Sequence, residues 1–299
     1  MQLLAYLLVY PLLWLISILP FRLMYMLSDA IYLLVYYLIG YRKKVVRNNL
    51  ALSFPEKSAA ERLVIEKKFY RHMCDMFLEM IKTMNISERE IRKRFVFTNM
   101  DEYLTLEKKG KSIIMMAAHY ASYEWVISMN YYITFEGFAI YKRVANKYFD
   151  RLVHKIRSRF QAHLVTTKKT IDTITTNQAN GRLGVYGFAG DQSPKANKVY
   201  HWGIFMGHPT AMITGGEMLA KRFDMNMIYL NVEKVKRGYY QATFVPLSEN
   251  VREVPDYQIT DRFMSLVEAQ VKKAPEYYLW THKRWKAKVR AAKDQTNLK

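Results

Sequence analysis

The chain contains one pair of residues suited to proton transfer, a histidine and a glutamate that follow a short apolar run. Ser112 to Ala117 are almost wholly apolar and are predicted to form a buried strand. His119 comes two residues after this run, and Glu124 follows five residues later. A neutral histidine can act as a general base near pH 7, and a carboxylate can fix its tautomer and stabilise the imidazolium that forms. Such a pair could deprotonate an alcohol.

The two side chains need a particular local structure to meet. On one straight helix, a five-residue separation rotates them by about 140° from each other. They converge if His119 lies in the loop that leaves the strand and Glu124 lies in the first turn of the next helix. That is the carboxyl end of a strand, where open α/β sheets place their chemistry. The spacing alone is a weak signal, so a partly exposed polar pair is the alternative.

Other kinds of catalytic chemistry find little support. Cys74 is the single cysteine, which excludes an internal disulfide and a cysteine-based zinc site, and its neighbours are typical of a packed helix face. The seven histidines show no H-E-x-x-H or comparable ligand spacing, so we expect neither a metal nor a cofactor. Ser122 lacks the G-x-S-x-G setting of a nucleophilic serine. We therefore expect no covalent acyl-enzyme.

The charge balance limits the possible partners. The chain has 46 Lys and Arg against 26 Asp and Glu, a net charge of +20. Nucleic acid, an anionic membrane surface or an acidic protein would each suit it. Because 51% of the 299 residues are hydrophobic, the chain can also bury a large core.

The first 21 residues favour the membrane. They contain no charged side chain, and about 20 apolar residues span a bilayer's hydrocarbon core. A signal peptide would need an early cationic region and a small-residue cleavage site, and neither is present. We predict a membrane helix that is kinked at Pro11. The alternative is a very hydrophobic helix inside a soluble core.

A second apolar stretch, Leu23 to Tyr41, carries Asp29 in its middle. It is either a second span or a helix that lies in the membrane interface, and the charge favours the interface. A basic cluster follows it, which predicts the cytoplasmic side of the membrane. The cluster consists of Arg42, Lys43, Lys44 and Arg47.

The rest of the chain alternates helical and strand patterns, which predicts an α/β fold. Capping-box patterns at Ser58 with Glu61 and at Ser87 with Glu90 predict two helix starts. Two strand-like runs joined by a turn at Arg237-Gly238 predict a hairpin. We therefore expect a mixed central sheet flanked by helices.

Several stretches, taken with the apolar N-terminus and the H-x4-E spacing, resemble one family. The chain is similar to the bacterial lipid A biosynthesis acyltransferases, the lauroyl and myristoyl enzymes related to lysophospholipid acyltransferases. The resemblance covers nearly the whole chain, in order. The stretches that carry it are "RNNLALSFPEKS", "YKRVANKYFDRLVHKIRSRF", "GDQSP", "FMGHPTAMITG" and "YYLWTHKRWK".

The resemblance implies a fold, a reaction and a location. The fold would be the glycerolipid-acyltransferase-like sheet, with a membrane anchor and interfacial helix over residues 1–40 and a catalytic domain over residues 41–299. The enzyme would move a fatty acyl chain from acyl carrier protein to a hydroxyl of a lipid A precursor. It would lie at the cell inner membrane with its catalytic domain on the cytoplasmic side. His119 would be the base and Glu124 its partner.

The resemblance also suggests substrate-binding residues. Arg157 could bind a sugar phosphate or polarise the thioester carbonyl, and Arg159 competes for that role. Ordinary helix charges and loop caps are the alternatives for this group. The chain departs from the family pattern at Lys142-Arg143, where an Arg-Pro pair is common, and after Gln192, where a Gly-Pro step is missing. These departures bear on the choice of donor or acceptor. The substrate-binding candidates are Lys142, Asn146, Arg157, Arg159, Asp191 and Gln192.

The end of this pattern alternates aromatic and cationic residues. Trp280 and Trp285 enclose His282, Lys283 and Arg284. This pattern suits a membrane interface, and a packed helix end is the alternative.

Two other functions compete with lipid A acylation. The nearer is an acyltransferase for a phospholipid or aminolipid, but such enzymes carry an F-P-E-G-T-R type motif after the dyad. Here "FPEKS" lies upstream of the dyad and lacks the glycine. The more distant is a non-catalytic membrane tether or nucleic-acid binder. Its cations should gather with stacking aromatics in one groove, whereas here they are dispersed along the chain.

Overall fold

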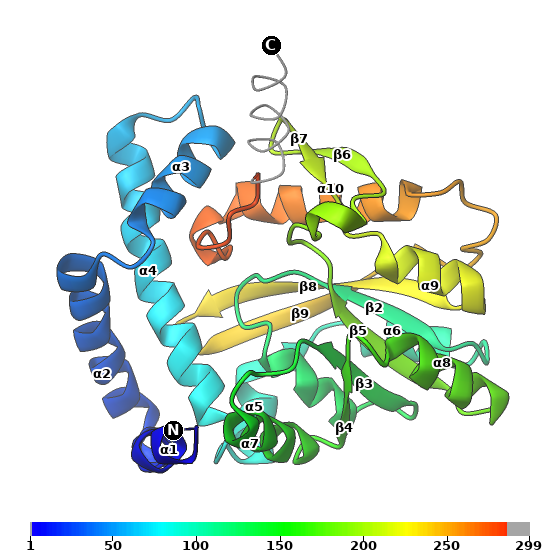
Figure 1. Ribbon diagram of the computed structural model, residues 1–299, viewed down its shortest axis with the longest axis horizontal. Helices are drawn as coiled ribbons and strands as arrows, with labels where there is room; N and C mark the ends of the chain where they lie inside the picture. The colour runs from blue at the N-terminus through cyan, green and yellow to red at the C-terminus, as the bar shows by residue number, and fades with distance from the viewer. Residues whose placement is uncertain (1, 286–299) are drawn as a thin grey trace.

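A seven-stranded mixed sheet forms the centre of the molecule (Figure 1). The computed structural model describes residues 2–285. The strand order is β1-β9-β8-β2-β5-β3-β4, with β8 and β9 antiparallel and the other neighbours parallel. The predicted α/β fold with a mixed sheet and a hairpin is confirmed. The strands of this sheet are β1 (Phe95–Phe97), β2 (Ile113–Ala117), β3 (Glu136–Tyr141), β4 (Ala162–Thr166), β5 (Gly184–Ala189), β8 (Asn226–Lys236) and β9 (Tyr239–Ser248).

Helices cover the sheet and extend from one end of it (Figure 1). The last two α-helices, α9 and α10, pack against β8, while α5 and α6 contact β9. A short ribbon of β6 (Trp202–Phe205) and β7 (His208–Ala211) follows β5 in the chain. The helices are α1 (Gln2–Ile18), α2 (Phe21–Leu33), η1 (Leu34–Ile39), α3 (Lys43–Ser53), α4 (Ala59–Lys82), α5 (Glu88–Arg94), α6 (Met100–Glu107), η2 (Trp125–Tyr131), α7 (Lys147–Ser158), α8 (Thr170–Ala179), η3 (Ala196–Lys198), α9 (Gly215–Phe223), α10 (Gln258–Lys273) and η4 (Pro275–Tyr277).

Both predicted helix starts are confirmed by their caps. The Ser58 hydroxyl accepts from the backbone N–H of Glu61 at 3.2 Å, and the Glu61 carboxylate accepts from the Ser58 N–H at 2.7 Å. The Ser87 hydroxyl accepts from the N–H of Glu90 at 3.2 Å. These bonds satisfy amide groups that a helix leaves without partners in its first turn.

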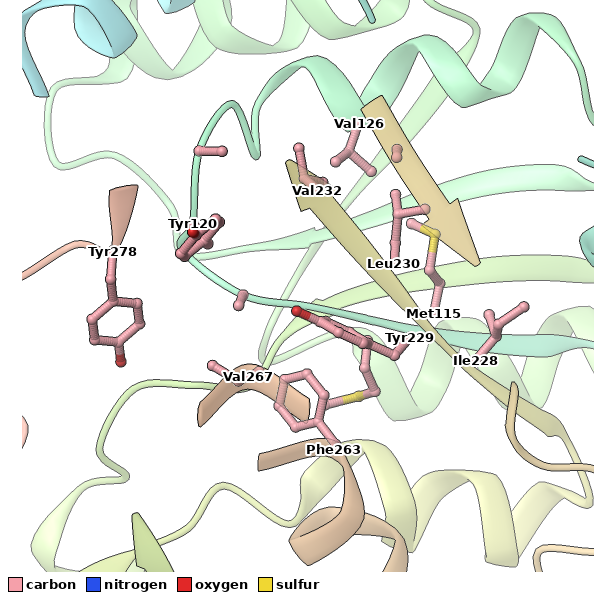
Figure 2. Close-up of a cluster of buried hydrophobic side chains, with 14 of the residues drawn as sticks. Met115, Tyr120, Val126, Ile228, Tyr229, Leu230, Val232, Phe263, Val267 and Tyr278 are labelled. Carbon is pink, nitrogen blue, oxygen red and sulfur yellow. The ribbon is translucent and has the colours of Figure 1, made fainter. Parts of the chain in front are cut away.

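The core holds the central strands rigidly in place. Strand β2 lies between β8 and β5, and helices cover it, so its residues are apolar on both faces. Figure 2 shows Met115 of β2 beside Leu230 of β8, on the face of the sheet away from Phe263 of α10. Tyr229 of β8 meets Phe263 of α10 edge to face, with 5.3 Å between the ring centroids. This packing fixes the end of β2 from which the predicted histidine loop leaves.

The apolar N-terminus forms two helical units, one in each of the two apolar stretches that the sequence analysis identified. Helix α1 continues through Pro11 and ends at Ile18, and α2 begins at Phe21. Pro20 explains the break, because proline disfavours helical geometry in the residue before it and supplies no N–H. Within residues 2–285, one helix is long and apolar enough to cross a membrane. It is Phe21–Ile39, which consists of α2 and the continuous η1. The predicted apolar N-terminal helix is therefore confirmed as α1. The candidate span lies in the second apolar stretch, which we expected to lie in the membrane interface.

One side of α2 is attached by polar contacts to α4 and to the β8–β9 turn. Ser28 donates to Asp75 of α4 at 2.7 Å, and Tyr25 donates to Glu79 at 2.8 Å. Arg237, in the β8–β9 turn, bridges Asp29 and Asp75 at 2.8 and 2.7 Å. The opposite side of α2 exposes large apolar side chains. They are Leu23, Met26 and Leu33.

The turn between β8 and β9 is shaped to receive α2. Gly238 has a φ of +73°, a conformation that L side chains rarely adopt. A Cβ there would lie 2.0 Å from the Tyr25 hydroxyl oxygen. The glycine therefore permits both the turn and the close approach of the helix.

We expect Asp75→Asn to lower the free energy of unfolding by about 3 kcal/mol, because it leaves the positive charges of Arg237 and the buried Lys234 without their shared carboxylate. The measurement is chemical unfolding of the purified protein in detergent. Asp101→Asn, the same change at an exposed position of α6, should cost less than about 0.5 kcal/mol. Equal losses in the two variants would contradict a stabilising network around Asp75.

Candidate functional site

Two neighbouring parallel strands bring a histidine and an aspartate together. In the register of β2 and β5, Ala117 lies opposite Ala189, and the N–H of Gly190 donates to the carbonyl of Ala117 at 3.2 Å. His119 and Asp191 each lie two residues beyond these paired ends. Nδ1 of His119 lies 2.7 Å from Oδ1 of Asp191. The loops that leave the two strands therefore meet at the carboxyl edge of the sheet.

The contact defines the protonation of the imidazole. The Asp191 side chain is 1% exposed and that of His119 is 21% exposed. An ionised carboxylate only accepts hydrogen bonds, so Nδ1 of His119 carries the hydrogen. Nε2 is then the basic nitrogen, as in hydrolase sites where an aspartate orients a histidine.

Asp191 also strengthens this base. Burial disfavours the imidazolium, but the charge and hydrogen bond of Asp191, helped by the charge of Glu124, raise the pKa of His119 above its ordinary value. Burial acts to raise the pKa of Asp191, yet His119 and Arg284 hold the pKa of that carboxyl below its usual range. A proton arriving at this pair is therefore held as an imidazolium–carboxylate ion pair.

Glu124, predicted to be the partner that fixes the tautomer of His119, contacts a different residue in the structure. Glu124 precedes η2, and its two carboxylate oxygens accept from Nη2 of Arg157 at 3.0 and 2.9 Å. Arg157 reaches it from the last turn of α7. Asp191 already occupies Nδ1 of the histidine, so Glu124 acts on His119 only through its charge. The role of Glu124 in the reaction stays a prediction.

Two other predicted binding residues have structural contacts. Arg159 donates to the backbone carbonyls of Thr83 at 2.9 Å, of Ile86 at 3.1 Å and of Met84. Asn146 caps α7 by accepting from the N–H of Tyr148 at 2.9 Å, and it donates to the carbonyl of Gln2 at 3.0 Å. These contacts tie together α4, α7 and α1.

The remaining predicted binding residues are less constrained. Lys142 is exposed and Gln192 is half-buried beside Asp191. Of the predicted site residues, the structure thus joins four in two contacting pairs, with the charge of Glu124 linking one pair to the other. The four are His119, Asp191, Glu124 and Arg157.

A segment near the C-terminus holds both site loops, and we call residues 277–285 the C-terminal clamp. The carbonyl of Tyr277 accepts from the N–H of Ala121 at 3.0 Å, and the N–H of Leu279 donates to the carbonyl of His119 at 3.1 Å. The Tyr278 hydroxyl donates to the carbonyl of Asp191 at 3.4 Å. The clamp therefore fixes the backbone on both sides of the histidine–aspartate contact.

The membrane-interface prediction for this segment is wrong for both tryptophans and for the arginine. Trp280, Arg284 and Trp285 are all buried, with 1%, 3% and 6% of their surface exposed. The N–H of Ser193 donates to Nε2 of His282 at 3.2 Å, and its hydroxyl donates to the Arg284 carbonyl at 2.5 Å. The part these residues play around Asp191 had no signal in the local sequence.

No metal is needed to explain these contacts. Residues 2–285 contain no group of three or more His, Cys, Asp or Glu placed to hold a metal ion. The arrangement provides a buried carboxylate, an imidazole with a basic nitrogen, and an arginine fixed by a second carboxylate. These are the parts needed for proton transfer beside a developing negative charge.

We expect Asp191→Asn to lower the pKa of His119 below its ordinary value, because burial then acts without the compensating carboxylate. The measurement is an NMR pH titration of the full chain labelled with [13Cε1]histidine, with His119→Gln to assign the resonance. The resonance of His163, which pairs with Glu136 at 3.3 Å, is the internal control that the change should leave in place. An unchanged midpoint for His119 would show that Asp191 does not control its protonation.

Comparison with known proteins covers nearly the whole chain. The family described as "Bacterial lipid A biosynthesis acyltransferase" matches residues 1–287. The lipid A biosynthesis lauroyltransferase of Escherichia coli (strain K12) is 23% identical over 278 residues, covering 92% of this chain and 89% of the relative. The lipid A biosynthesis palmitoleoyltransferase of the same organism is 21% identical over 294 residues, with the same coverage of both chains. The chain therefore belongs to the bacterial lipid A biosynthesis acyltransferase family, and it is an acyltransferase.

Proposed function

We propose that this enzyme transfers a fatty acyl chain from an acyl carrier protein thioester to a hydroxyl of a lipid A precursor, in a late acylation step. The observation that carries the proposal is the 2.7 Å contact between His119 and the buried Asp191, which makes Nε2 a base at the carboxyl edge of the sheet. The names of the relatives, a lauroyltransferase and a palmitoleoyltransferase, support a fatty acyl donor.

In the proposed step, Nε2 of His119 removes the proton of the acceptor hydroxyl as its oxygen attacks the thioester carbonyl. Asp191 stabilises the imidazolium that forms. The tetrahedral intermediate then collapses, the carbon–sulfur bond breaks, and the imidazolium returns its proton to the leaving thiolate. An ester and a free thiol result, and His119 is neutral again.

Arg157 is the candidate residue to stabilise the oxyanion that develops in the reaction or to bind a phosphate of the acceptor. The developing oxyanion needs hydrogen-bond donors, and a sugar phosphate of the acceptor would need a cation. Glu124 binds only Nη2 of Arg157, so it can fix the guanidinium while other N–H groups remain for substrate. Glu124 would then act as a positioning residue for Arg157, in place of the direct histidine partner that the motif predicted.

A direct transfer without an acyl-enzyme agrees with the nucleophiles present. Burial raises the pKa of the Cys74 thiol to about 12, and Cys74 lies in α4, outside the site. Ser122 is buried, with 2% of its surface exposed. Neither side chain is placed for attack on a bulky thioester.

The location follows from the N-terminal helices and the charge. We propose that residues 1–40 attach the enzyme to the inner membrane, with residues 41–299 on the cytoplasmic side. The exposed apolar side of α2 and the candidate span Phe21–Ile39 support the attachment. The net charge of +20 suits an acidic carrier protein, a phosphorylated acceptor and an anionic leaflet alike.

The second candidate acceptor is a phospholipid or aminolipid. Mass spectrometry of lipids from a strain lacking this gene separates the two. Lipid A that lacks one acyl chain supports the proposal, whereas intact lipid A together with a changed phospholipid or aminolipid contradicts it.

His119→Ala should lower the rate of acyl transfer by at least about a hundredfold, because general-base catalysis contributes that much or more. The assay supplies acyl carrier protein thioester and lipid A precursor to the purified enzyme in membranes, with melting curves to confirm folding. His163→Ala is the matched control, since this histidine lies in β4, away from Asp191. A folded His119→Ala enzyme with a rate close to wild type would refute the mechanism, and an acyl group trapped on Ser122 or Cys74 would replace it.

A further inference from the structure

Arg284 is a buried cation whose place in the clamp has no role in the proposed reaction. Its side chain is 3% exposed, and Nη1 donates to the carbonyl of Ala211 at 2.9 Å and to the Ser193 hydroxyl at 3.3 Å. Within residues 2–285, Nε has no hydrogen-bond partner and no carboxylate lies within 4.0 Å of the guanidinium. A buried charge without an ion-pair partner destabilises the folded protein. Some other interaction must offset that cost.

Asp191 is a buried anion that also lacks part of its hydrogen bonding. Oδ1 meets His119, whereas Oδ2 is buried and has no hydrogen-bond partner among residues 2–285. The proposed base must be neutral before it acts, so in that state the carboxylate is a buried anion beside an uncharged ring. Arg284 is one of the groups that hold the pKa of Asp191 below its usual range. The two buried charges therefore offset each other at long range.

Hydrogen bonds of the clamp also connect Arg284 to the loop that carries Asp191. The Ser193 hydroxyl, two residues from Asp191, donates to the Arg284 carbonyl and accepts from the Arg284 guanidinium. Trp285, next in the chain, donates from Nε1 to the Thr210 hydroxyl at 2.9 Å. Arg284 is thus fixed on the side of the Asp191 loop away from solvent.

We propose that Arg284 is a positioning residue whose fixed positive charge keeps Asp191 ionised while His119 is neutral, and so sets how readily the histidine takes a proton. This inference rests on the proposed function, in which His119 is the base. Arg284 would touch no substrate and would act only through Asp191.

The direction of the effect follows from the charges. The unprotonated pair of His119 and Asp191 has a net charge of −1 and the protonated pair has none, so a nearby cation favours the unprotonated, active state. Removing Arg284 should raise the pKa of His119, and activity should then be lost at higher pH. Charged and titratable groups on the surrounding elements stay in place in this comparison. They are Tyr123, Glu124, Arg157, Tyr229, Tyr278 and His282.

The test compares Arg284→Met, which removes the charge and keeps an apolar chain, with Arg284→Lys, which keeps the charge. In the full chain labelled with [13Cε1]histidine, Arg284→Met should raise the midpoint of His119 by about one pH unit, whereas Arg284→Lys should move it by less than about 0.3 unit. The acid limb of kcat/KM for acyl transfer should move upward by the same amount. Arg284→Gln should behave as Met does, and it retains an N–H donor for Ala211 if the Met variant fails to fold.

Thr210→Val is the matched structural control, because it removes the hydrogen bond to Trp285 and changes no charge. It should lower the melting temperature and leave the His119 midpoint unchanged. The proposal is overturned if Arg284→Met and Arg284→Gln leave that midpoint in place, or if Thr210→Val raises it equally. The NMR midpoint of His119 does not depend on which acceptor the enzyme uses. If the proposed lipid A reaction is wrong but this inference is right, the assay shows no transfer while Arg284→Met still shifts the His119 midpoint.

Discussion

The pairing of β2 with β5 determines where the groups of the site lie. The two strands are parallel and their last residues are paired. The loops that follow therefore start side by side at the carboxyl edge of the sheet. A histidine and an aspartate two residues into these loops then meet without any long side chain reaching across. A shift of one residue in this register would turn alternate side chains to the opposite face and separate the pair. The core around β2, β8 and α10 resists such a shift (Figure 2).

Buried charges serve two different purposes in this molecule. Around Asp75, each charge has a direct partner, and the network joins α2 to α4 and to the β8–β9 turn. Around Asp191, the charges are incompletely paired, with one carboxylate oxygen and one guanidinium nitrogen left without hydrogen bonds among residues 2–285. Charges that are all paired hold elements of the fold together. A carboxylate that is only partly paired can strengthen its interaction with a histidine when that histidine takes up a proton. This contrast is the physical reason to treat the second cluster as the working site.

Local sequence patterns predicted the elements well and their long-range partners poorly. The strand predicted to end at Ala117 and the helix starts at Ser58 and Ser87 depend on neighbours in the chain, and all three are confirmed. The partner of His119 depends on β5 lying beside β2, and strand order is a property of the whole fold. The H-x4-E spacing therefore identified a histidine at the carboxyl edge of the sheet but not the carboxylate that contacts it.

The local sequence also did not predict which charged residues are buried. The alternation of cations and aromatics around Arg284 is typical of a membrane interface, yet the packing of the clamp against the Asp191 loop puts this arginine in the interior. At the N-terminus, the uncharged run predicted one helix over 21 residues. Helix α1 ends at Ile18, just before Pro20, although Pro11 is accommodated within it. In both places tertiary packing or a single backbone constraint outweighed composition.

The central claim is that Asp191 acts through His119, whereas Glu124 acts through Arg157. Double-mutant cycles in single-turnover acyl transfer test it directly. If the claim holds, Asp191→Asn slows the wild-type enzyme but adds no further loss to His119→Ala, while Glu124→Gln slows the His119→Ala enzyme by roughly another tenfold or more. The opposite pattern, in which Asp191→Asn costs the same with and without His119 and Glu124→Gln costs nothing once His119 is absent, would contradict the account.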